Sequence, residues 1–152
     1  MSNRASFRKR HPANAEEDLF VDLWRTCDLL SRRPAQVLKT QDLSATQYNV
    51  LRILRGAPEG LPCGEIASRM ITRDPDITRL LDRLERRGLI SRCRENRDRR
   101  MVMARIEPAG LKLLASLDGT VQEVHRDQLG HMGGQRLRQL TVLLALAREK
   151  VP

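Results

Sequence analysis

Residues 74–90 read DPDITRLLDRLERRGLI, and this stretch contains most of the signals that decide the fold. Its apolar residues recur at the three- and four-residue intervals of one helix face: Ile77, Leu80, Leu81 and Leu84. The opposite face is polar and mostly basic: Asp76, Arg79, Arg83 and Arg86. We expect Asp74 to cap the helix, Pro75 to take its first position and Gly88 to end it in the left-handed conformation. One face is thus expected to be buried and the other to meet an anionic partner.

The residues that follow are expected to form an arginine-rich hairpin. Residues 89–94 and 99–106 have the pattern of strands, and the ENRD of residues 95–98 favours a turn. A helix followed by such a hairpin is typical of a winged helix-turn-helix, because the helix fits the DNA major groove and the hairpin tip can reach the minor groove. The alternative is an ordinary solvated charged face. Self-repulsion argues against it, since many arginines are gathered here: Arg92, Arg94, Arg97, Arg99, Arg100 and Arg105.

The composition bounds the class of protein. The 152 residues are enough for one domain, and the net charge of +9 indicates an anionic partner. Aromatic residues make up only 3% of the chain, which disfavours a single-strand binder that stacks bases on aromatic rings. Double-stranded nucleic acid is therefore the expected partner.

Several other classes are disfavoured by what the sequence does not contain. It has no glycine-rich phosphate loop, no Ser/His/Asp-like set and no zinc-type spacing, so we expect neither an enzyme nor a cofactor or metal. Its three cysteines are predicted to be reduced, and the location to be cytoplasmic. No run of about twenty apolar residues is present, and the basic N-terminus lacks the apolar segment of a secretion signal, so no membrane partner is expected.

The remaining sequence predicts a mainly α fold. A disordered basic tail over residues 1–15 precedes a helix over residues 16–33, which we expect Pro34 to break or kink before residues 35–41 resume. A capping box of Ser44 and Gln47 should start a helix that ends near Gly56. A loop over residues 57–62, a helix over 64–70 and a turn over 71–73 then lead to the helix between Asp74 and Gly88, which we call the reading helix. These elements form the helix-turn-helix.

The two ends of the chain have more leucine than one small domain can cover. Pro108 should begin a long helix, residues 130–134 interrupt it, and residues 135–150 form a last helix. We therefore predict a winged helix-turn-helix with a two-stranded wing over residues 43–107 and a helical dimerisation region over residues 16–42 and 108–152. The expected anchors of dimerisation are Leu19, Leu23, Trp24, Leu137, Leu140 and Leu144.

Residues 43–117 resemble the MarR family of bacterial transcriptional regulators. The matching motifs are LS..Q..VL at residues 43–51, LP..EIA at 61–67, ITRLLDRLERRGLI at 77–90, Arg92, DRR at 98–100, and I...G at 106–110. The resemblance implies a homodimer whose two winged domains bind a palindromic operator in double-stranded DNA. It also implies that a small-molecule effector, often aromatic or phenolic, releases a repressor from DNA, or that a cysteine senses oxidants in its place.

The resemblance also implies roles for particular residues. Arg100 matches the wing arginine that enters the minor groove, and Asp98 matches the carboxylate that orients it. Thr72 and Arg73 match positions beside DNA phosphates, whereas Asp76, Thr78, Arg79 and Arg83 fall on the groove-facing side of the helix. The expected DNA-binding set is Thr72, Arg73, Asp76, Thr78, Arg79, Arg83, Arg97, Arg99 and Arg100.

This sequence departs from the family's pattern at three positions. Asp76 must either accept a hydrogen bond from cytosine or turn away to pair with Arg79 or Arg73. Glu107 replaces the usual threonine cap of the following helix, and Pro34 lies in a helix that is normally continuous.

Two alternative functions stay open at this point. One is a non-specific architectural DNA-binding protein, which the charge fits equally well. The other is a redox sensor using Cys27, Cys63 or Cys93, because a helix start near Cys63 and arginines beside Cys93 would lower a thiol pKa.

Overall fold

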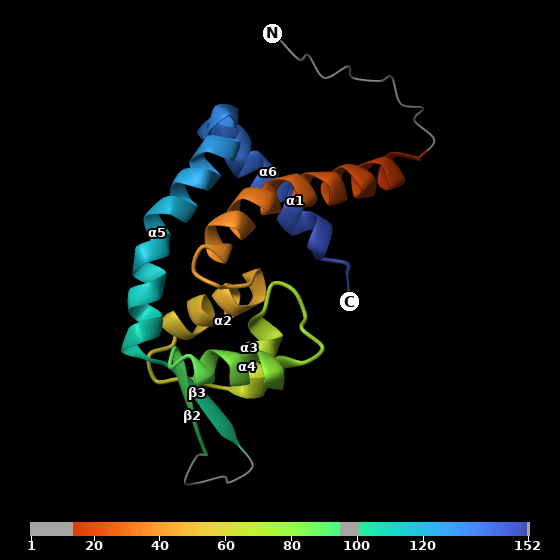
Figure 1. The fold of residues 1–152 in the computed structure, drawn as a ribbon. Coiled ribbons are helices and arrows are strands. Elements are labelled where there is room, and N and C mark those ends of the chain that lie inside the picture. The colour runs from red at the N-terminus through yellow and green to blue at the C-terminus, as the bar shows by residue number, and fades with distance from the viewer. Residues whose placement is uncertain (1–13, 95–100, 152) are drawn as a thin grey trace. The chain divides into compact units, whose positions relative to one another are not determined.

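The computed structural model describes residues 14–94 and 101–151, and it is mainly helical (Figure 1). The described residues from Arg33 onward form one compact unit, and the described residues before Arg33 form a second. The predicted fold class, a winged helix-turn-helix with flanking helices, is confirmed. In chain order the elements are α1 (Ala15–Lys39), α2 (Ala45–Arg55), β1 (Leu61–Pro62), α3 (Cys63–Arg69), α4 (Ile77–Arg86), β2 (Ile90–Arg94), β3 (Val102–Ile106), α5 (Pro108–Leu129), the short 3-10 helix η2 (Gly130–Met132) and α6 (Gly133–Arg148).

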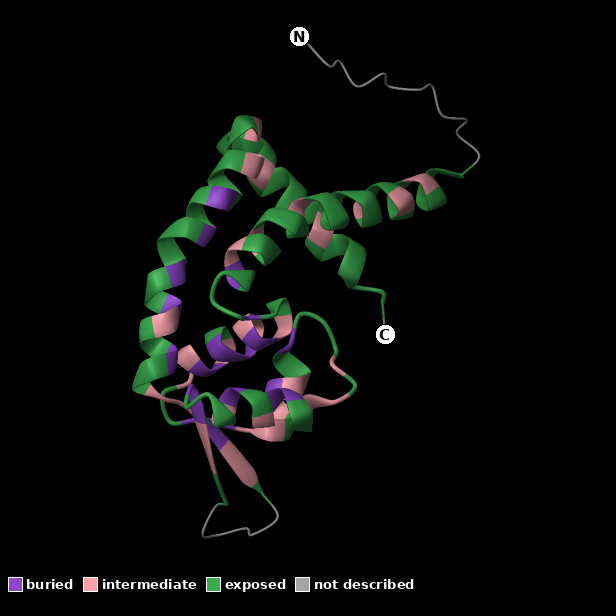
Figure 2. Ribbon diagram, in the orientation of Figure 1, coloured by how far each residue is buried: buried purple, intermediate pink, exposed green. Residues whose placement is uncertain are grey.

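The core of the larger unit lies where α2, α3, α4, the sheet and the first half of α5 meet (Figure 2). Its largest fully buried side chains include Leu54 of α2, Ile66 of α3, Leu84 of α4 and Leu114 of α5. Full burial of such a side chain contributes about 1.5–3 kcal/mol, so each of these helices is held by its own apolar face.

The helix α2 begins with the predicted capping box. The Ser44 hydroxyl accepts a hydrogen bond from the Gln47 backbone N–H at 3.1 Å, and the Gln47 side-chain oxygen accepts one from the Ser44 backbone N–H at 2.9 Å. Such a cap stabilises a helix by about 1 kcal/mol. The helix ends at Gly56, as predicted.

The start of α4 differs from the prediction. Asp76, not Asp74, is the N-cap, because the Asp76 carboxylate accepts a hydrogen bond from the Arg79 backbone N–H at 3.1 Å. Asp74 instead accepts a hydrogen bond from the Asp76 backbone N–H at 2.9 Å. The expectation that Asp74 caps the helix and Pro75 begins it was therefore wrong by two residues. The expected left-handed conformation of Gly88, with φ of 67°, is confirmed.

The helix α1 runs through Pro34 without a break, so of the predicted break or kink the break was wrong. A proline inside a helix costs about 3 kcal/mol, because it removes one N–H donor and crowds the preceding turn. Contacts on either side of it hold the helix together. Arg33 forms an ion pair with Asp127 of α5 at 3.2 Å, and Leu38 is buried in the core.

The sheet is antiparallel and has the strand order β1-β3-β2. The predicted pair β2 and β3 is present, with Arg92 opposite Ala104. A third strand, Leu61–Pro62, pairs with β3 on its other side, so the prediction that residues 57–62 form a loop was wrong for these two residues. Pro62 lacks an N–H donor but is tolerated there, because β1 lies at the edge of the sheet.

The helix α5 begins at Pro108, just after β3 ends at Ile106. Pro108 is at its first position, as predicted, and the Glu107 side chain makes no capping hydrogen bond. The Glu107 backbone N–H donates to the Leu89 carbonyl at 3.0 Å. Gly110 packs so tightly that an added Cβ would lie 2.4 Å from the Leu89 carbonyl oxygen. The start of α5 is thus fixed against the segment between α4 and β2.

The helix α6 contributes no buried residue to the single chain. Along α6, Leu140 and Leu143 are exposed, and Leu137 and Leu144 are half-buried. No helix in the part of the chain that the structure describes is both long enough and apolar enough to span a membrane.

Replacing Gly110 with alanine is expected to lower the free energy of unfolding by about 1–3 kcal/mol, because the new Cβ would overlap the Leu89 carbonyl. Urea unfolding followed by circular dichroism measures this change. The matched control is Gly119→Ala in the same helix, where an added Cβ meets nothing within 4 Å. Its expected effect is a gain of up to about 1 kcal/mol from helix propensity. Equal effects at both positions would contradict the tight contact at Gly110.

Candidate nucleic-acid interface

The helix α4 presents its polar face to solvent. Leu80, Leu81 and Leu84 are buried on the opposite face and hold the helix on the core. The residues expected to face the major groove, Thr78, Arg79 and Arg83, are all exposed, and the Arg79 side chain is 78% exposed. A helix anchored in this way can enter a groove without losing its packing.

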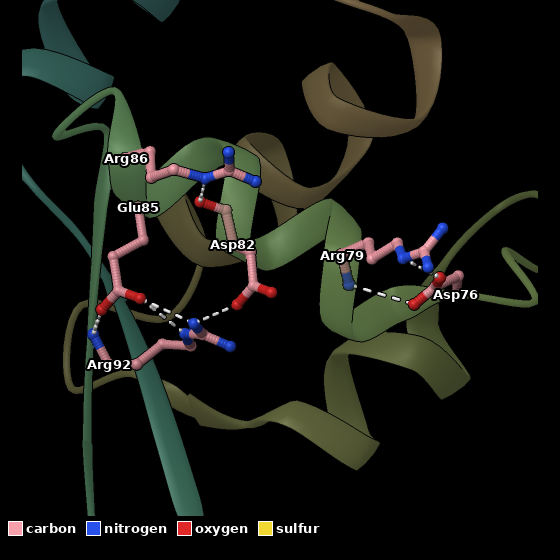
Figure 3. A network of polar contacts seen from close by, with 6 residues as sticks. All are labelled: Asp76, Arg79, Asp82, Glu85, Arg86 and Arg92. Atoms are coloured by element: carbon pink, nitrogen blue, oxygen red, sulfur yellow. Dashed lines mark hydrogen bonds and ion pairs between the residues drawn. The ribbon is translucent and has the colours of Figure 1, made fainter.

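Asp76 and Arg79 form an ion pair at the start of α4 (Figure 3). The Arg79 Nε atom lies 3.0 Å from the Asp76 carboxylate, which also caps the helix through the Arg79 backbone N–H. Asp76 was predicted either to accept a hydrogen bond from cytosine or to pair with Arg79 or Arg73. In the structure, which contains no DNA, it pairs with Arg79. The Asp76 carboxylate is therefore paired with a cation of its own helix.

The turn before α4 is held against α2. The Asn49 side-chain oxygen accepts a hydrogen bond from the Ile71 backbone N–H at 2.8 Å. Thr72 and Arg73, the residues expected to lie beside phosphates, follow directly and are exposed. The hydrogen bond thus fixes the backbone from which both side chains extend.

Arg92 at the base of the hairpin is turned toward α4 and not toward solvent (Figure 3). Its side chain is 21% exposed and forms ion pairs with Glu85, at 2.7 Å, and with Asp82. Hydrogen bonding to Glu85 raises the pKa of Arg92, and hydrogen bonding to Asp82 adds to this against the opposing effect of burial. Counting Arg92 among the arginines that attract an anionic partner was therefore wrong, because two carboxylates of its own chain neutralise it.

The wing tip lies outside the described residues. This applies to Arg97, Asp98, Arg99 and Arg100, so their predicted roles stay predictions. The strands that lead to the tip are described, and Arg94 and Arg105 on them are exposed. Neither forms an ion pair with another described residue, so both are available to phosphates.

Cys63 does not have the reactive character expected from a helix start. The residue is half-buried, and burial raises the pKa of its thiol, which outweighs the opposite effect of the Arg92 charge. The expectation of a lowered pKa was wrong because α3 is short and its start is packed against the core. Cys27 and Cys93 are exposed. Across residues 14–94 and 101–151, no cluster of three or more His, Cys, Asp or Glu residues could hold a metal.

The predicted dimerisation residues include large apolar side chains that the single chain leaves exposed. In α1, Trp24 is 67% exposed and packs edge-to-face on Phe20, with ring centroids 5.7 Å apart, and Leu19 is also exposed. Leu23 is half-buried. In α6, Leu140, Leu143 and Leu146 are exposed. Exposed apolar side chains of this size and number are typical of an interaction surface.

Sequence reasoning missed the role of Arg87. It follows α4 and donates two hydrogen bonds, to the Asp42 carbonyl at 2.7 Å and to the Gln41 carbonyl at 3.0 Å. Asp42 has a left-handed backbone, with φ of 51°. Nothing in the sequence pattern pairs residues so far apart. The role of Arg92 had a usable signal, since it shares a strand face with the buried residue Ile90.

Comparisons with known proteins agree with this geometry. A model of the MarR family matches residues 43–102. The chain is 40% identical to a MarR transcription factor from Planctomyces limnophilus, whose crystal structure it matches with a TM-score of 0.68 over 86% of this chain and 96% of that one. It is 27% identical to the homoprotocatechuate degradative operon repressor of Escherichia coli, over 71% of this chain and 72% of that protein. The fold is also that of S. aureus MepR, solved as a complex with DNA, at 22% identity and a TM-score of 0.75 over 90% and 98% of the two chains.

Alkylation of Cys63 by iodoacetamide near pH 7 is expected to be slower than alkylation of Cys93, because burial shields the Cys63 thiol and disfavours its thiolate form. Single-cysteine variants isolate the two sites: Cys27→Ser with Cys93→Ser leaves Cys63, and Cys27→Ser with Cys63→Ser leaves Cys93. Mass spectrometry of timed samples measures the rates. A faster reaction at Cys63 would restore the redox-sensing hypothesis for that residue.

Proposed function

Because the chain belongs to the MarR family of DNA-binding transcriptional regulators, we propose that it is a homodimeric repressor that binds a palindromic operator and releases it on binding a small molecule. Proteins of this family are transcription regulators and not enzymes. The observation that carries the proposal is the exposed face of Thr78, Arg79 and Arg83, backed by the buried leucines of α4.

DNA binding divides between contacts that position the protein and contacts that read sequence. The exposed turn of Thr72 and Arg73 and the strand arginines supply phosphate contacts, which give affinity that falls with salt. Arg79 is suited to read guanine in the major groove, because a guanidinium can donate two hydrogen bonds to its edge. Asp76 then serves to hold Arg79 and to cap the helix. The wing residues Arg97, Arg99 and Arg100 bind DNA, with Arg100 entering the minor groove and Asp98 orienting Arg100.

The homodimer is supported by the apolar side chains that one chain leaves exposed. Residues 16–42 and 108–152 supply the interface, with Leu19, Leu23 and Trp24 from one end and Leu137, Leu140 and Leu144 from the other. A two-fold axis would place the two reading helices about one helical turn of DNA apart, roughly 34 Å.

Repression is supported by the E. coli relative, which is named as the repressor of a degradative operon. Release by a small molecule is what the resemblance to the MarR family implies. The place of action is the cytoplasm, where the DNA of a bacterial cell lies. Selection of bound duplexes from a random pool, followed by a screen for compounds that release them, tests both parts. A non-specific architectural protein, the alternative that the net charge of +9 fits equally well, would enrich no sequence.

Replacing Arg79 with alanine is expected to weaken binding to the selected operator by about 1–3 kcal/mol and to relax the base preference at one position in each half-site. Gel-shift titration and a second round of selection measure the two effects. Arg148→Ala is the control, since it removes the same charge from the exposed end of α6. Equal losses in the two variants would mean that Arg79 contributes charge alone.

Replacing Leu140 with glutamate is expected to shift the protein from dimer to monomer, because it places a charge in the proposed interface. Analytical ultracentrifugation at several concentrations measures the shift. Since no residue of α6 is fully buried in the single chain, the fold of the winged unit should be unaffected. Ile71→Glu, at an exposed apolar residue of the turn before α4, is the control and should remain dimeric. A monomeric wild-type protein would reject the homodimer.

A further inference from the structure

We propose that Arg92, held by Glu85 and Asp82, is a positioning residue that sets the angle between the reading helix α4 and the wing. This inference rests on the proposed function, since it concerns how two DNA-reading elements are aligned. It assigns to three residues with no expected DNA contact a role in specificity.

The contacts between Glu85 of α4 and Arg92 of β2 fix the relative orientation of the helix and the strand as well as the distance between them (Figure 3). One Glu85 oxygen accepts a hydrogen bond from the Arg92 backbone N–H at 3.1 Å. The other accepts from the Arg92 Nε and Nη2 atoms, at 3.0 Å and 2.7 Å. Because one carboxylate holds both the main chain and the planar guanidinium of the same residue, β2 can neither slide along α4 nor rotate about it without breaking hydrogen bonds.

Asp82 adds a second point of attachment one turn earlier on the same helix. Its carboxylate pairs with Arg92 Nη2, so the guanidinium spans two successive positions of the α4 surface. The Asp82 backbone carbonyl also accepts a hydrogen bond from Arg86 Nε at 3.4 Å. Contacts at two points along α4 define an angle, which one contact alone would not.

The position of Arg92 in the hairpin makes this angle matter. Arg92 pairs with Ala104, which is fully buried, and β2 continues for only two residues beyond it, to Arg94. The attachment therefore lies at the base of the wing, where the sheet is still supported by the core. A rotation at this base would carry the whole wing away from the groove that it is proposed to enter.

The charges of the cluster argue that its role is geometric. Asp82, Glu85 and Arg92 together carry one net negative charge. They lie on the helix and the strand that are proposed to approach DNA, which is a polyanion. By charge alone, the cluster opposes binding to DNA. What Glu85 and Asp82 supply is the alignment of Arg92 and the strand that carries it.

Glu85→Gln is therefore expected to weaken operator binding, whereas the loss of one negative charge would by itself strengthen it. Removing a carboxylate strengthens attraction to any duplex, whereas loss of alignment weakens binding to the operator. We expect affinity for the selected operator to fall by about tenfold, a loss in the range of one mismatched base pair, while affinity for random duplex stays equal or rises. Gel-shift titrations of the 152-residue chain with both duplexes measure the two affinities.

Three comparisons make the test specific. Glu59→Gln removes the same charge from an exposed loop residue and should keep the ratio of operator to random affinity. Arg92→Lys keeps the charge but cannot form the two-atom contact, so it should lose specificity as Glu85→Gln does. Hydroxyl-radical footprinting should lose the wing's minor-groove protection, while methylation protection by α4 in the major groove persists. Urea unfolding checks that each variant is folded at the assay temperature.

A parallel rise in affinity for both duplexes in Glu85→Gln would overturn the proposal, since charge alone would then explain the cluster. Unchanged wing protection in both Glu85→Gln and Arg92→Lys would overturn it as well. A wild-type protein that does not distinguish its selected duplex from random DNA would instead reject the proposed function, so the two failures can be told apart.

Discussion

Burial of the apolar face of α4 is the constraint on which the remaining arrangement depends. Leu80, Leu81 and Leu84 occupy consecutive turns of a short helix, and burying the three contributes several kcal/mol, at about 1.5–3 kcal/mol each. A helix of ten residues is not stable alone in water, so this burial both forms the helix and fixes its orientation. The polar face must then point outward, because the side-chain positions of a helix are rigidly related. Presentation of Arg79 to a partner follows from packing on the other side.

The arginines of α4, of the residue that follows it and of β2 divide into two groups, which the amino-acid composition alone does not distinguish. Arg87 and Arg92 are used inside the chain, one on backbone carbonyls and one on carboxylates. Arg83 and Arg94 are exposed and form no ion pair with another described residue. The first group supplies directional hydrogen bonds within the chain that lysine could not, whereas the second group offers charge and donors to an external anion. A basic segment is therefore partly a structural framework and partly an interface.

Features that depend on neighbouring residues in the sequence were predictable, and those that depend on distant contacts were less so. The capping box of Ser44 and Gln47 and the left-handed Gly88 follow from local backbone chemistry. The pairing of Leu61 with Ala104 does not, because a two-residue strand has no pattern of its own. The expected break at Pro34 failed for a related reason, since tertiary contacts outweighed a local preference. Within the site, exposure of Arg79 followed from periodicity, but burial at Cys63 required the packed core.

The hydrogen bonds of Arg87 mechanically connect the first and fourth helices. The guanidinium extends from the end of α4 to two carbonyls just beyond the end of α1, in a turn where Asp42 has a left-handed backbone. Pulling these elements apart would exchange both hydrogen bonds for water, at a cost of about 0.5–1.5 kcal/mol each. A tilt of α4 would therefore pull on the backbone that follows the last turn of α1. The two hydrogen bonds join these segments in addition to the burial of Leu38 in the core.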